Sequence, residues 1–213
     1  MEQRSNEWFE ARKGKFTASQ ISRLLGKKNK DGTLSKATKS SIDTYAFEKA
    51  VETVFGLEPE LEFMPKDMQR GVELEPYAFK LFSEIISADF LNVTECGFYS
   101  DGDHSGASPD GLVGEDAILE IKCPQRNKLC KYIANGEEEI NIIYYAQMQM
   151  QMMTTGRKLS YFFNYVIIDG VELHHTIKVK RDQEMIDLIK ERVIIATEIK
   201  NNYICKLKDN KQF

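Results

Sequence analysis

The feature that most constrains this chain is a short strand-like run with two charges inside it. Residues 117–123 read AILEIKC. Because successive side chains of a strand point to opposite faces, Leu119 and Ile121 share an apolar face, while Glu120 and Lys122 share the other face. Taken alone, the pattern is typical of a half-exposed strand with a solvated salt bridge. The residues that lie opposite the charged face decide whether it forms a functional site instead.

A partner strand is predicted immediately before this run. Residues 114–116 read GED, a turn signal between two strand-like segments, so residues 110–122 are expected to form a hairpin. If the loop has three residues, Val113 pairs with Ala117, and Asp110 lies opposite Glu120. Residues that face each other in this way have Cβ atoms about 5 Å apart on the same side of the sheet. A loop one residue longer or shorter would separate the two carboxylates.

The predicted pair of carboxylates needs a counter-charge. Asp110 and Glu120 repel each other at this distance unless a pKa rises or a cation binds between them. Mg²⁺ binds one or two carboxylates while keeping several waters, so it fits such a pair. Lys122 beside it could orient or deprotonate a water, or neutralise charge that develops on a phosphate. The charged face is therefore equipped for phosphodiester hydrolysis.

The remaining periodicities predict an α/β fold of the α+β type in one domain spanning residues 1–213. Apolar spacing and end signals indicate helices at 5–13, 17–25, 41–55, 66–86, 125–134, 141–155 and 181–200. Strands are expected at 91–99 and in a second hairpin, 159–168 with 171–178, across Asp169-Gly170. This order predicts a central mixed sheet flanked by helices.

Two local expectations concern helix ends. Thr17 and Gln20 have the spacing of a capping box, which predicts that the Thr17 side chain caps the second helix. Pro76 lies within the fourth helix, where a missing N–H and ring crowding are expected to kink or restart it. Glu75 would lie at that irregularity.

Charge distribution, rather than net charge, indicates a nucleic-acid partner. The chain carries −4 overall, with 42% hydrophobic and 29% charged residues. Residues 11–40 contain nine basic residues and one acid, so this segment carries +8 and the remainder −12. A chain of this kind can present a basic surface to DNA phosphates while its carboxylates bind metal elsewhere. The alternative for residues 26–39 is a solvated lysine loop without a partner.

Compartment and redox state follow from what the sequence lacks. No apolar run approaches the roughly 18 residues of a membrane span, and residues 1–5 do not resemble a signal peptide, so a cytoplasmic protein is expected. Cys96, Cys123, Cys130 and Cys205 form no CxxC pair and show no zinc-ligand spacing. Reduced thiols and no membrane partner are expected.

Four motifs in order resemble those of one nuclease family. Ser108-Pro109-Asp110-Gly111 with Glu120-Ile121-Lys122-Cys123-Pro124 resembles the PD-(D/E)xK nuclease signature, and more specifically the phage lambda exonuclease family of viral-type recombination nucleases. The resemblance runs over nearly the whole chain and implies a restriction-endonuclease-like core. The other three matching motifs are Trp8-x-x-x-Arg12-x-Gly14 with Thr17-Ala18-Ser19, Gly71-x-x-x-Glu75, and Ala146-Gln147-x-Gln149 followed by Thr155.

The resemblance assigns a metal site. It implies that Asp110, Glu120 and the backbone carbonyl of Ile121 hold one or two Mg²⁺ ions, for which Mn²⁺ could substitute. Glu75 joins the metal shell, and Lys122 activates the attacking water. Without the resemblance, Glu75 is one of several acids on a helix.

The resemblance also assigns a pocket for the terminal 5′-phosphate of DNA. It is lined by Arg12, Ser19, Ser108 and Gln147, whose guanidinium, hydroxyl and amide donors suit a phosphate. Each also has an ordinary interpretation: a surface arginine, a capping or turn serine, a solvent-facing glutamine. Met68 matches an apolar wedge that separates the terminal base pair, with a core residue as the alternative. Trp8 is expected to pack under Arg12.

The expected function is a Mg²⁺-dependent, processive 5′-to-3′ exonuclease on double-stranded DNA ends. It would release mononucleotides and leave a 3′ overhang for phage-type recombination by strand annealing. The resemblance further implies a homotrimeric ring, a single-strand annealing partner and a bacterial or phage-infected host. The alternatives are a structure- or site-specific endonuclease of the same superfamily and a non-catalytic DNA-end binding module. The cysteine arrangement does not match the iron–sulfur nucleases of that superfamily.

Overall fold

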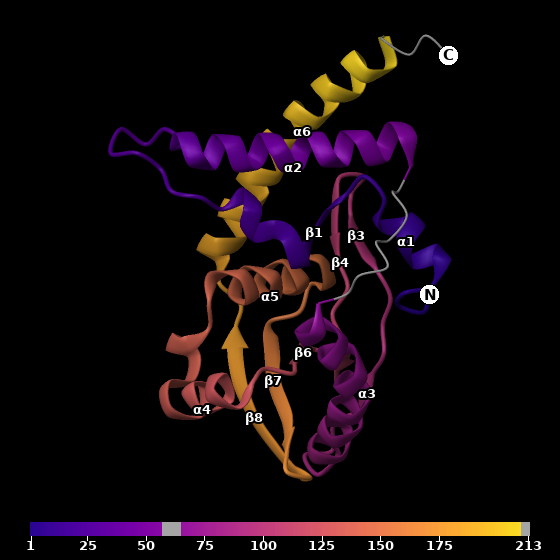
Figure 1. The fold of residues 1–213 in the computed structure, drawn as a ribbon, viewed down its shortest axis with the longest axis vertical. Coiled ribbons are helices and arrows are strands. Elements are labelled where there is room, and N and C mark those ends of the chain that lie inside the picture. Colours follow the sequence, from indigo (N-terminus) through magenta and orange to yellow (C-terminus); the bar gives the residue numbers. More distant parts are fainter. Residues whose placement is uncertain (57–64, 210–213) are drawn as a thin grey trace.

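A five-stranded mixed sheet in the order β2-β5-β6-β7-β8 forms the centre of the molecule (Figure 1). The computed structural model describes residues 1–56 and 65–209. Strands β6 and β7 are parallel, and the other neighbours are antiparallel. The strands are β2 (Val93–Thr94), β5 (Gly111–Val113), β6 (Ala117–Lys122), β7 (Leu159–Ile168) and β8 (Val171–Lys180).

A second, three-stranded sheet joins the start of the chain to the approach to the hairpin. Its order is β1-β4-β3, with β1 (Phe16–Thr17), β4 (Ser105–Ala107) and β3 (Tyr99–Asp101). Strand β1 runs parallel to β4, and Phe16 N–H donates to the His104 carbonyl over 2.8 Å. This pairing brings the segment after Arg12 next to the chain that leads to Asp110.

Helices cover both faces of the central sheet. Its odd-numbered positions, including Leu119, Ile121 and Phe163, pack with Phe82 of α3, whereas Phe162 packs with Tyr132 of α4. Figure 1 shows α3 and α4 on opposite sides of the strands. The helical segments are α1 (Asn6–Arg12), the 3₁₀ helix η1 (Ala18–Leu24), α2 (Lys36–Phe55), α3 (Lys66–Ser87), α4 (Arg126–Asn135), the 3₁₀ helix η2 (Gly136–Glu139), α5 (Ile142–Thr155) and α6 (Gln183–Asp209).

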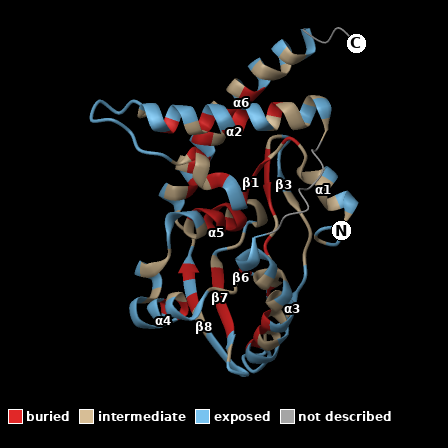
Figure 2. Cartoon of the chain, in the orientation of Figure 1, coloured by how far each residue is buried: buried red, intermediate tan, exposed pale blue. Residues whose placement is uncertain are grey.

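Helix α5 is the most enclosed helix near the sheet. Every residue from 146 to 152 is buried, and Figure 2 shows this segment and the centre of β7 among the most buried parts of the chain. Met148 contacts the sheet-side cluster, whereas Ala146 and Met150 belong to a cluster formed with η1, α2 and α6. Polar side chains on α5 are therefore held away from water.

The predicted α/β architecture with a central mixed sheet is confirmed, and both hairpins form at the predicted turns. The last helix buries Ile189 and Ala196, and it continues past its expected end at residue 200 to Asp209. Of the strand expected at 91–99, only β2 and the first residue of β3 form. In the described ranges, no helix combines the length and apolar character needed to cross a bilayer.

The predicted side-chain cap at Thr17 and the predicted start of the third helix are wrong, and the helix that contains Pro76 does not restart there. Thr17 precedes a 3₁₀ helix and makes no side-chain cap bond, because its hydroxyl lies 3.4 Å from Ser19 Oγ instead. Helix α2 begins five residues earlier than expected, since Ser35 Oγ accepts from Thr38 N–H and caps it. Pro76 lies inside α3 without ending it. Pro76 is exposed, so water can reach the carbonyl that loses its donor.

Candidate active site

The hairpin of β5 and β6 sets the positions of the two central carboxylates. Val113 pairs with Ala117, and Asp110 N–H donates to the Leu119 carbonyl over 3.0 Å, so the predicted register is confirmed. The Asp110 carboxylate turns back onto β6, where Oδ2 accepts from Ile121 N–H over 2.6 Å. Asp110 therefore lies opposite Glu120, as the three-residue turn predicts.

Glu120 is almost completely buried. Its residue is 1% exposed, which rules out the wet salt bridge that the strand alone indicated. Lys122 Nζ lies 2.5 Å from Glu120 Oε1, so one cation serves this carboxylate. The burial follows from position, because β6 pairs with β5 and β7 and packs against α5. A buried carboxylate requires donors as well as a counter-charge.

Two glutamines of α5 supply those donors. Gln147 Nε2 donates to Glu120 Oε1 over 2.7 Å, and Gln151 Nε2 donates to Glu120 Oε2 over 2.6 Å. Residues four apart on a helix lie on one face, so both amides reach the same carboxylate. Gln147 was expected at a terminal phosphate, but here it holds Glu120. Gln151 was not among the predicted site residues, although its helical spacing from Gln147 was a usable signal.

The electrostatics of the pair indicate a deficit of positive charge. Burial, followed by the charge of Glu120, raises the pKa of Asp110 well above its usual range, although Lys122 opposes the shift. Burial alone would lower the pKa of the Lys122 ammonium, but the charges of Glu120 and Asp110 raise it above its usual range. Lys122 is therefore a cation here, and it does not fully neutralise the two acids.

Glu75 lies at the mouth of the same site. Two adjoining cavities, one of about 800 Å³, share Glu75, Ile121 and Arg4 in their walls; the larger also contains Lys122, and the other Asp110. Arg4 Nη2 lies 2.8 Å from Glu75 Oε2, so the carboxylate is engaged by a guanidinium. Arg4 was not among the predicted site residues, because it precedes the first motif and contacts Glu75 only through the fold.

The donor set fits a hard divalent cation that keeps part of its water shell. Asp110 supplies a carboxylate at the wall of one cavity, Glu120 supplies a second one that is buried, and Ile121 lines both cavities. Across residues 1–56 and 65–209, no cluster of three or more His, Cys, Asp or Glu side chains is arranged to hold a metal ion. Mg²⁺ does not require such a cluster, because one or two carboxylates suffice alongside waters. The raised pKa of Asp110 shows where an added cation would be stabilised.

Arg12 lies in a separate polar arrangement with Trp8 and Ser108. Its guanidinium stacks on the Trp8 ring at 3.9 Å, and its Nη1 lies 3.5 Å from Ser108 Oγ. Trp8 Nε1 donates to the same hydroxyl over 2.8 Å. Burial lowers the pKa of Arg12 to about 10, and within the described residues no carboxylate forms an ion pair with it. A cation that is partly desolvated and unpaired is suited to receive an external anion.

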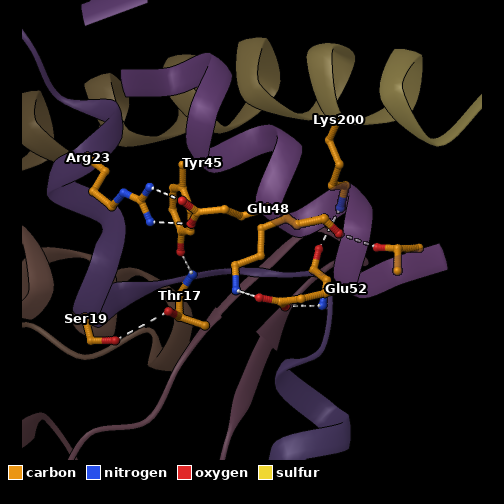
Figure 3. Close-up of polar contacts among 10 residues, drawn as sticks. Thr17, Ser19, Arg23, Tyr45, Glu48, Glu52 and Lys200 are labelled. Atoms are coloured by element: carbon orange, nitrogen blue, oxygen red, sulfur yellow. Dashed lines mark hydrogen bonds and ion pairs between the residues drawn. The ribbon is translucent and has the colours of Figure 1, made fainter. Parts of the chain in front are cut away.

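A polar network fixes the chain around Ser19. Tyr45 Oη accepts from Thr17 N–H over 3.1 Å, and the Arg23 guanidinium binds both oxygens of Glu48 while stacking over the Tyr45 ring (Figure 3). Ser19 is exposed, and η1 packs against α5 and β4. Ser19 is thus presented beside the elements that carry Gln147 and lead to Ser108.

The turn after Arg12 is held from two sides. Glu52 accepts from Gly14 N–H over 3.0 Å, and Lys200 Nζ donates to the Gly14 carbonyl over 2.9 Å. Figure 3 shows Lys200 reaching down from α6 to this turn. Gly14 has φ +67°, and a Cβ there would lie 2.3 Å from Thr53 Oγ1, so only glycine fits. This support fixes where α1 ends and therefore where Arg12 points.

Met68 is not a core residue. It is 58% exposed in the first turn of α3 and lines the larger cavity together with Glu75 and Lys122. The core alternative for Met68 is therefore wrong. An exposed apolar side chain at the rim of a polar site is available to contact a bound molecule.

Comparisons with known proteins identify a family and solved structures with a similar fold. Residues 7–158 match the model of the YqaJ-like viral recombinase domain. An alkaline exonuclease (LHK-Exo) from Laribacter hongkongensis is 30% identical with a TM-score of 0.78, covering 96% of this chain and 97% of that one. LHK-Exo in complex with dAMP gives a TM-score of 0.77 at the same identity and coverage. A phage related exonuclease from Haemophilus somnus 129PT shares the fold, with a TM-score of 0.71, 21% identity and coverage of 91% and 96%. A comparison with curated sequences finds no match.

Proposed function

The chain belongs to the family of YqaJ-like viral recombinase domains, and from this premise we propose that it is a metal-dependent exonuclease that digests the 5′-ended strands of double-stranded DNA. The observation that carries the proposal is the pairing of Asp110 with Glu120 beside Lys122, with Arg12 in contact with Ser108 two residues before Asp110. The two carboxylates with Lys122 have the chemistry to hydrolyse a phosphodiester. Arg12 with Ser108 has the donors to recognise a terminal phosphate.

Mg²⁺ is the proposed cofactor, with Mn²⁺ as a possible substitute and one or two ions per site. Asp110, Glu120 and the Ile121 carbonyl would hold it, with Glu75 completing the shell. When bound, the ion polarises the phosphate and lowers the pKa of a coordinated water. Lys122, a cation beside Glu120, orients water and offsets the negative charge that grows on the phosphate.

The Arg12 site sets the direction of digestion. We assign the terminal 5′-phosphate to Arg12, Ser19 and Ser108, with Gln147 at its inner edge. Attack on the next phosphorus and cleavage of its bond to the 3′ oxygen releases a 5′-mononucleotide and leaves a new 5′-phosphate on the shortened strand. Each cycle therefore regenerates the group that the pocket binds, as processive digestion to a 3′ overhang requires.

We assign the exposed residues around the site to contacts with the DNA duplex. Met68 would act as the wedge that separates the terminal base pair, since it is exposed beside the proposed scissile position. The exposed loop with Lys27, Lys28 and Lys30 would guide the DNA backbone. We further propose that the chain assembles into a homotrimeric ring and delivers the overhang to a single-strand annealing protein. The proposed place of action is the cytoplasm of a bacterium or phage-infected host.

The test is digestion of an end-labelled linear duplex with and without Mg²⁺. Label at a 5′ end is expected to appear as mononucleotide first, and only with the metal present. Asp110→Ala and Lys122→Ala should each abolish release, whereas Asp116→Ala, an exposed acid at the tip of the same hairpin, should not. Wild-type rates in the first two variants would overturn the site assignment.

A closed circular duplex separates the alternatives. An exonuclease leaves the circle intact, whereas rapid cutting of the circle would indicate an endonuclease of the same superfamily. Binding of DNA ends without Mg²⁺-dependent release of nucleotides would identify a non-catalytic end-binding module. Light scattering on the purified protein tests the ring, since a monomer that remains fully active and processive would contradict it.

A further inference from the structure

A continuous chain of contacts joins the Arg12 site to Glu120. Arg12 and Trp8 both contact the Ser108 hydroxyl. The Ser108 carbonyl in turn accepts from Gln151 Nε2 over 3.2 Å, and the same nitrogen donates to Glu120 Oε2 over 2.6 Å. Gln151 is therefore the side chain that touches both the backbone of the phosphate pocket and the carboxylate of the metal site.

The orientation of the Gln151 amide is fixed by its partners. Both of its contacts are acceptors, a carbonyl and a carboxylate, so the NH₂ group must face them and uses both of its hydrogens. A flipped amide would place Oε1 against the carboxylate and lose both bonds. The two bonds hold the side chain in one arrangement between Ser108 and Glu120.

The amide is costly to bury in this arrangement. Gln151 is 0% exposed, and its Oε1 has no hydrogen-bond partner among the described residues. A buried acceptor without a partner destabilises a fold, typically by about 1–3 kcal/mol. Methionine, which occupies three neighbouring buried positions on this helix at 148, 150 and 152, would fill similar space without that cost. Packing alone therefore does not explain a glutamine at this position.

We propose that Gln151 is a positioning residue that couples occupancy of the 5′-phosphate pocket to the placement of Glu120. This inference rests on the proposed exonuclease function. A phosphate that takes the Arg12 guanidinium and the Ser108 hydroxyl as its donors moves the 108–110 segment. The Ser108 carbonyl then moves the Gln151 amide, and the amide moves Glu120. Asp110 lies two residues from Ser108, so both carboxylates respond to the same event.

The coupling has a kinetic signature that a purely structural role lacks. We would compare kcat/KM on blunt duplexes that differ only in carrying a 5′-phosphate or a 5′-hydroxyl. In the wild type the phosphate is expected to raise kcat/KM. In Gln151→Met the ratio of the two values is expected to fall about tenfold, because the phosphate no longer reaches Glu120. A structural defect would lower both rates by the same factor and preserve the ratio.

Gln149→Met is the matched control. Gln149 lies on the same helix, is equally buried at 0% exposure, and also makes two bonds, donating to the Lys180 carbonyl over 2.8 Å and accepting from Asp182 N–H over 2.8 Å. Its contacts lead toward α6 and not to Glu120. This variant also removes two hydrogen bonds of a buried amide, but should keep the wild-type ratio of phosphate to hydroxyl rates.

A binding measurement without turnover gives the second readout. Titration calorimetry of the DNA-free protein with MgCl₂ should give a dissociation constant about 10–100-fold weaker in Gln151→Met, the range typical when a residue that orients a metal ligand is lost. Gln149→Met should match the wild type. If Gln151→Met does not fold, Gln151→Asn keeps the amide but is one methylene too short to reach Ser108 and Glu120 together, and the same loss of coupling is expected.

The outcomes separate this inference from the proposed function. Equal losses on both substrates in the Gln151 variants, or an equal loss of the ratio in Gln149→Met, would overturn the coupling while leaving the exonuclease intact. A wild type indifferent to the 5′-phosphate would overturn the coupling and the pocket together. A wild type that releases no nucleotides with Mg²⁺ would overturn the proposed function itself.

Discussion

Arg4 and Glu75 form an ion pair at the mouth of the candidate active site, with Nη2 of the guanidinium 2.8 Å from Oε2 of the carboxylate. The segment that carries Arg4 is attached to the site, since Gln3 Nε2 donates to the Pro109 carbonyl over 2.7 Å, one residue before Asp110. A guanidinium on Glu75 competes for the oxygen that the proposed metal shell would use. Arg4 thus acts as an internal counter-ion of this carboxylate.

We expect Arg4→Ala to lower the Mg²⁺ concentration needed for half-maximal nuclease activity. Both partners are partly exposed, so the pair is worth up to about 1 kcal/mol, which corresponds to a change of up to about fivefold. A Mg²⁺ titration of initial rates measures it. Lys158→Ala, which removes an exposed contact with Asp116 on the hairpin, is the control. A higher Mg²⁺ requirement in Arg4→Ala would show that Arg4 assists the site instead.

Asp110→Asn is expected to abolish activity while stabilising the metal-free protein. Activity should fall about a hundredfold or more, because the several kcal/mol that a bound cation supplies are lost. Stability should rise at neutral pH, because burial and the charge of Glu120 oppose ionisation of Asp110 in the folded state. Thermal unfolding in EDTA and in Mg²⁺ should show that the metal stabilises the wild type and not the variant.

Asp110→Asn also allows a test of how the stability of the protein depends on pH, with a defined direction. The pKa of Asp110 in the folded protein lies above its unfolded value, so the folded state binds the proton more tightly. The stability this confers is present at low pH and is lost as the pH rises from the unfolded pKa through the folded pKa. In EDTA, the gain in Tm from Asp110→Asn should therefore shrink as the pH is lowered. A gain that grows on acidification would contradict the burial argument.

The arrangement of Asp110 and Glu120 could be predicted from sequence because it is local. A three-residue turn fixes the register of a hairpin, and the register fixes which side chains face each other. The burial of Glu120 could not be predicted in this way. It depends on β7 and α5, which come from distant parts of the chain, and it turns an apparent surface ion pair into an enclosed one.

Arg4 and Gln151 were missed for the same reason. Arg4 meets Glu75 across 71 residues of sequence, and Gln151 meets Glu120 across 31. Helical spacing predicts that Gln147 and Gln151 share a face, but not what that face contacts. The errors at the helix ends have a different origin. The start of α2 depends on a local cap, since Ser35 and Thr38 are three residues apart. At Thr17 the backbone N–H is held by the distant Tyr45. Local sequence signals therefore predict most helices, strands and hairpin registers. The contacts that set the chemistry of the site join distant residues and cannot be read from local spacing.

Arg12→Ala should reduce kcat/KM about 10–100-fold on duplexes with 5′-phosphate ends and far less on 5′-hydroxyl ends. The loss corresponds to one charge-assisted contact of about 1.5–3 kcal/mol. Arg12→Lys should recover only part of it, because a lysine cannot bind bidentately or stack on Trp8 in the same way. Lys158→Ala, which breaks an exposed contact with Asp116 away from the pocket, serves as a control for lost positive charge. Equal losses on both ends would remove Arg12 from phosphate recognition.

Lys200 allows a pH test of the support beneath Arg12. Burial lowers the pKa of this ammonium to about 8, while its Nζ holds the Gly14 carbonyl. A lysine whose folded pKa lies below its unfolded value makes the folded state bind fewer protons, so stability rises as the pH increases from about 8 toward 10.5. The Tm of the wild type, measured relative to Lys200→Met, should therefore rise between pH 7 and pH 10 by about 2–4 °C, as expected for about 1 kcal/mol in a domain of this size. Lys190→Met, at an exposed position of the same helix, should show no such trend. A difference that stays constant across this range would mean that the ammonium is not desolvated, and that Gly14 is held by the hydrogen bond without an electrostatic cost.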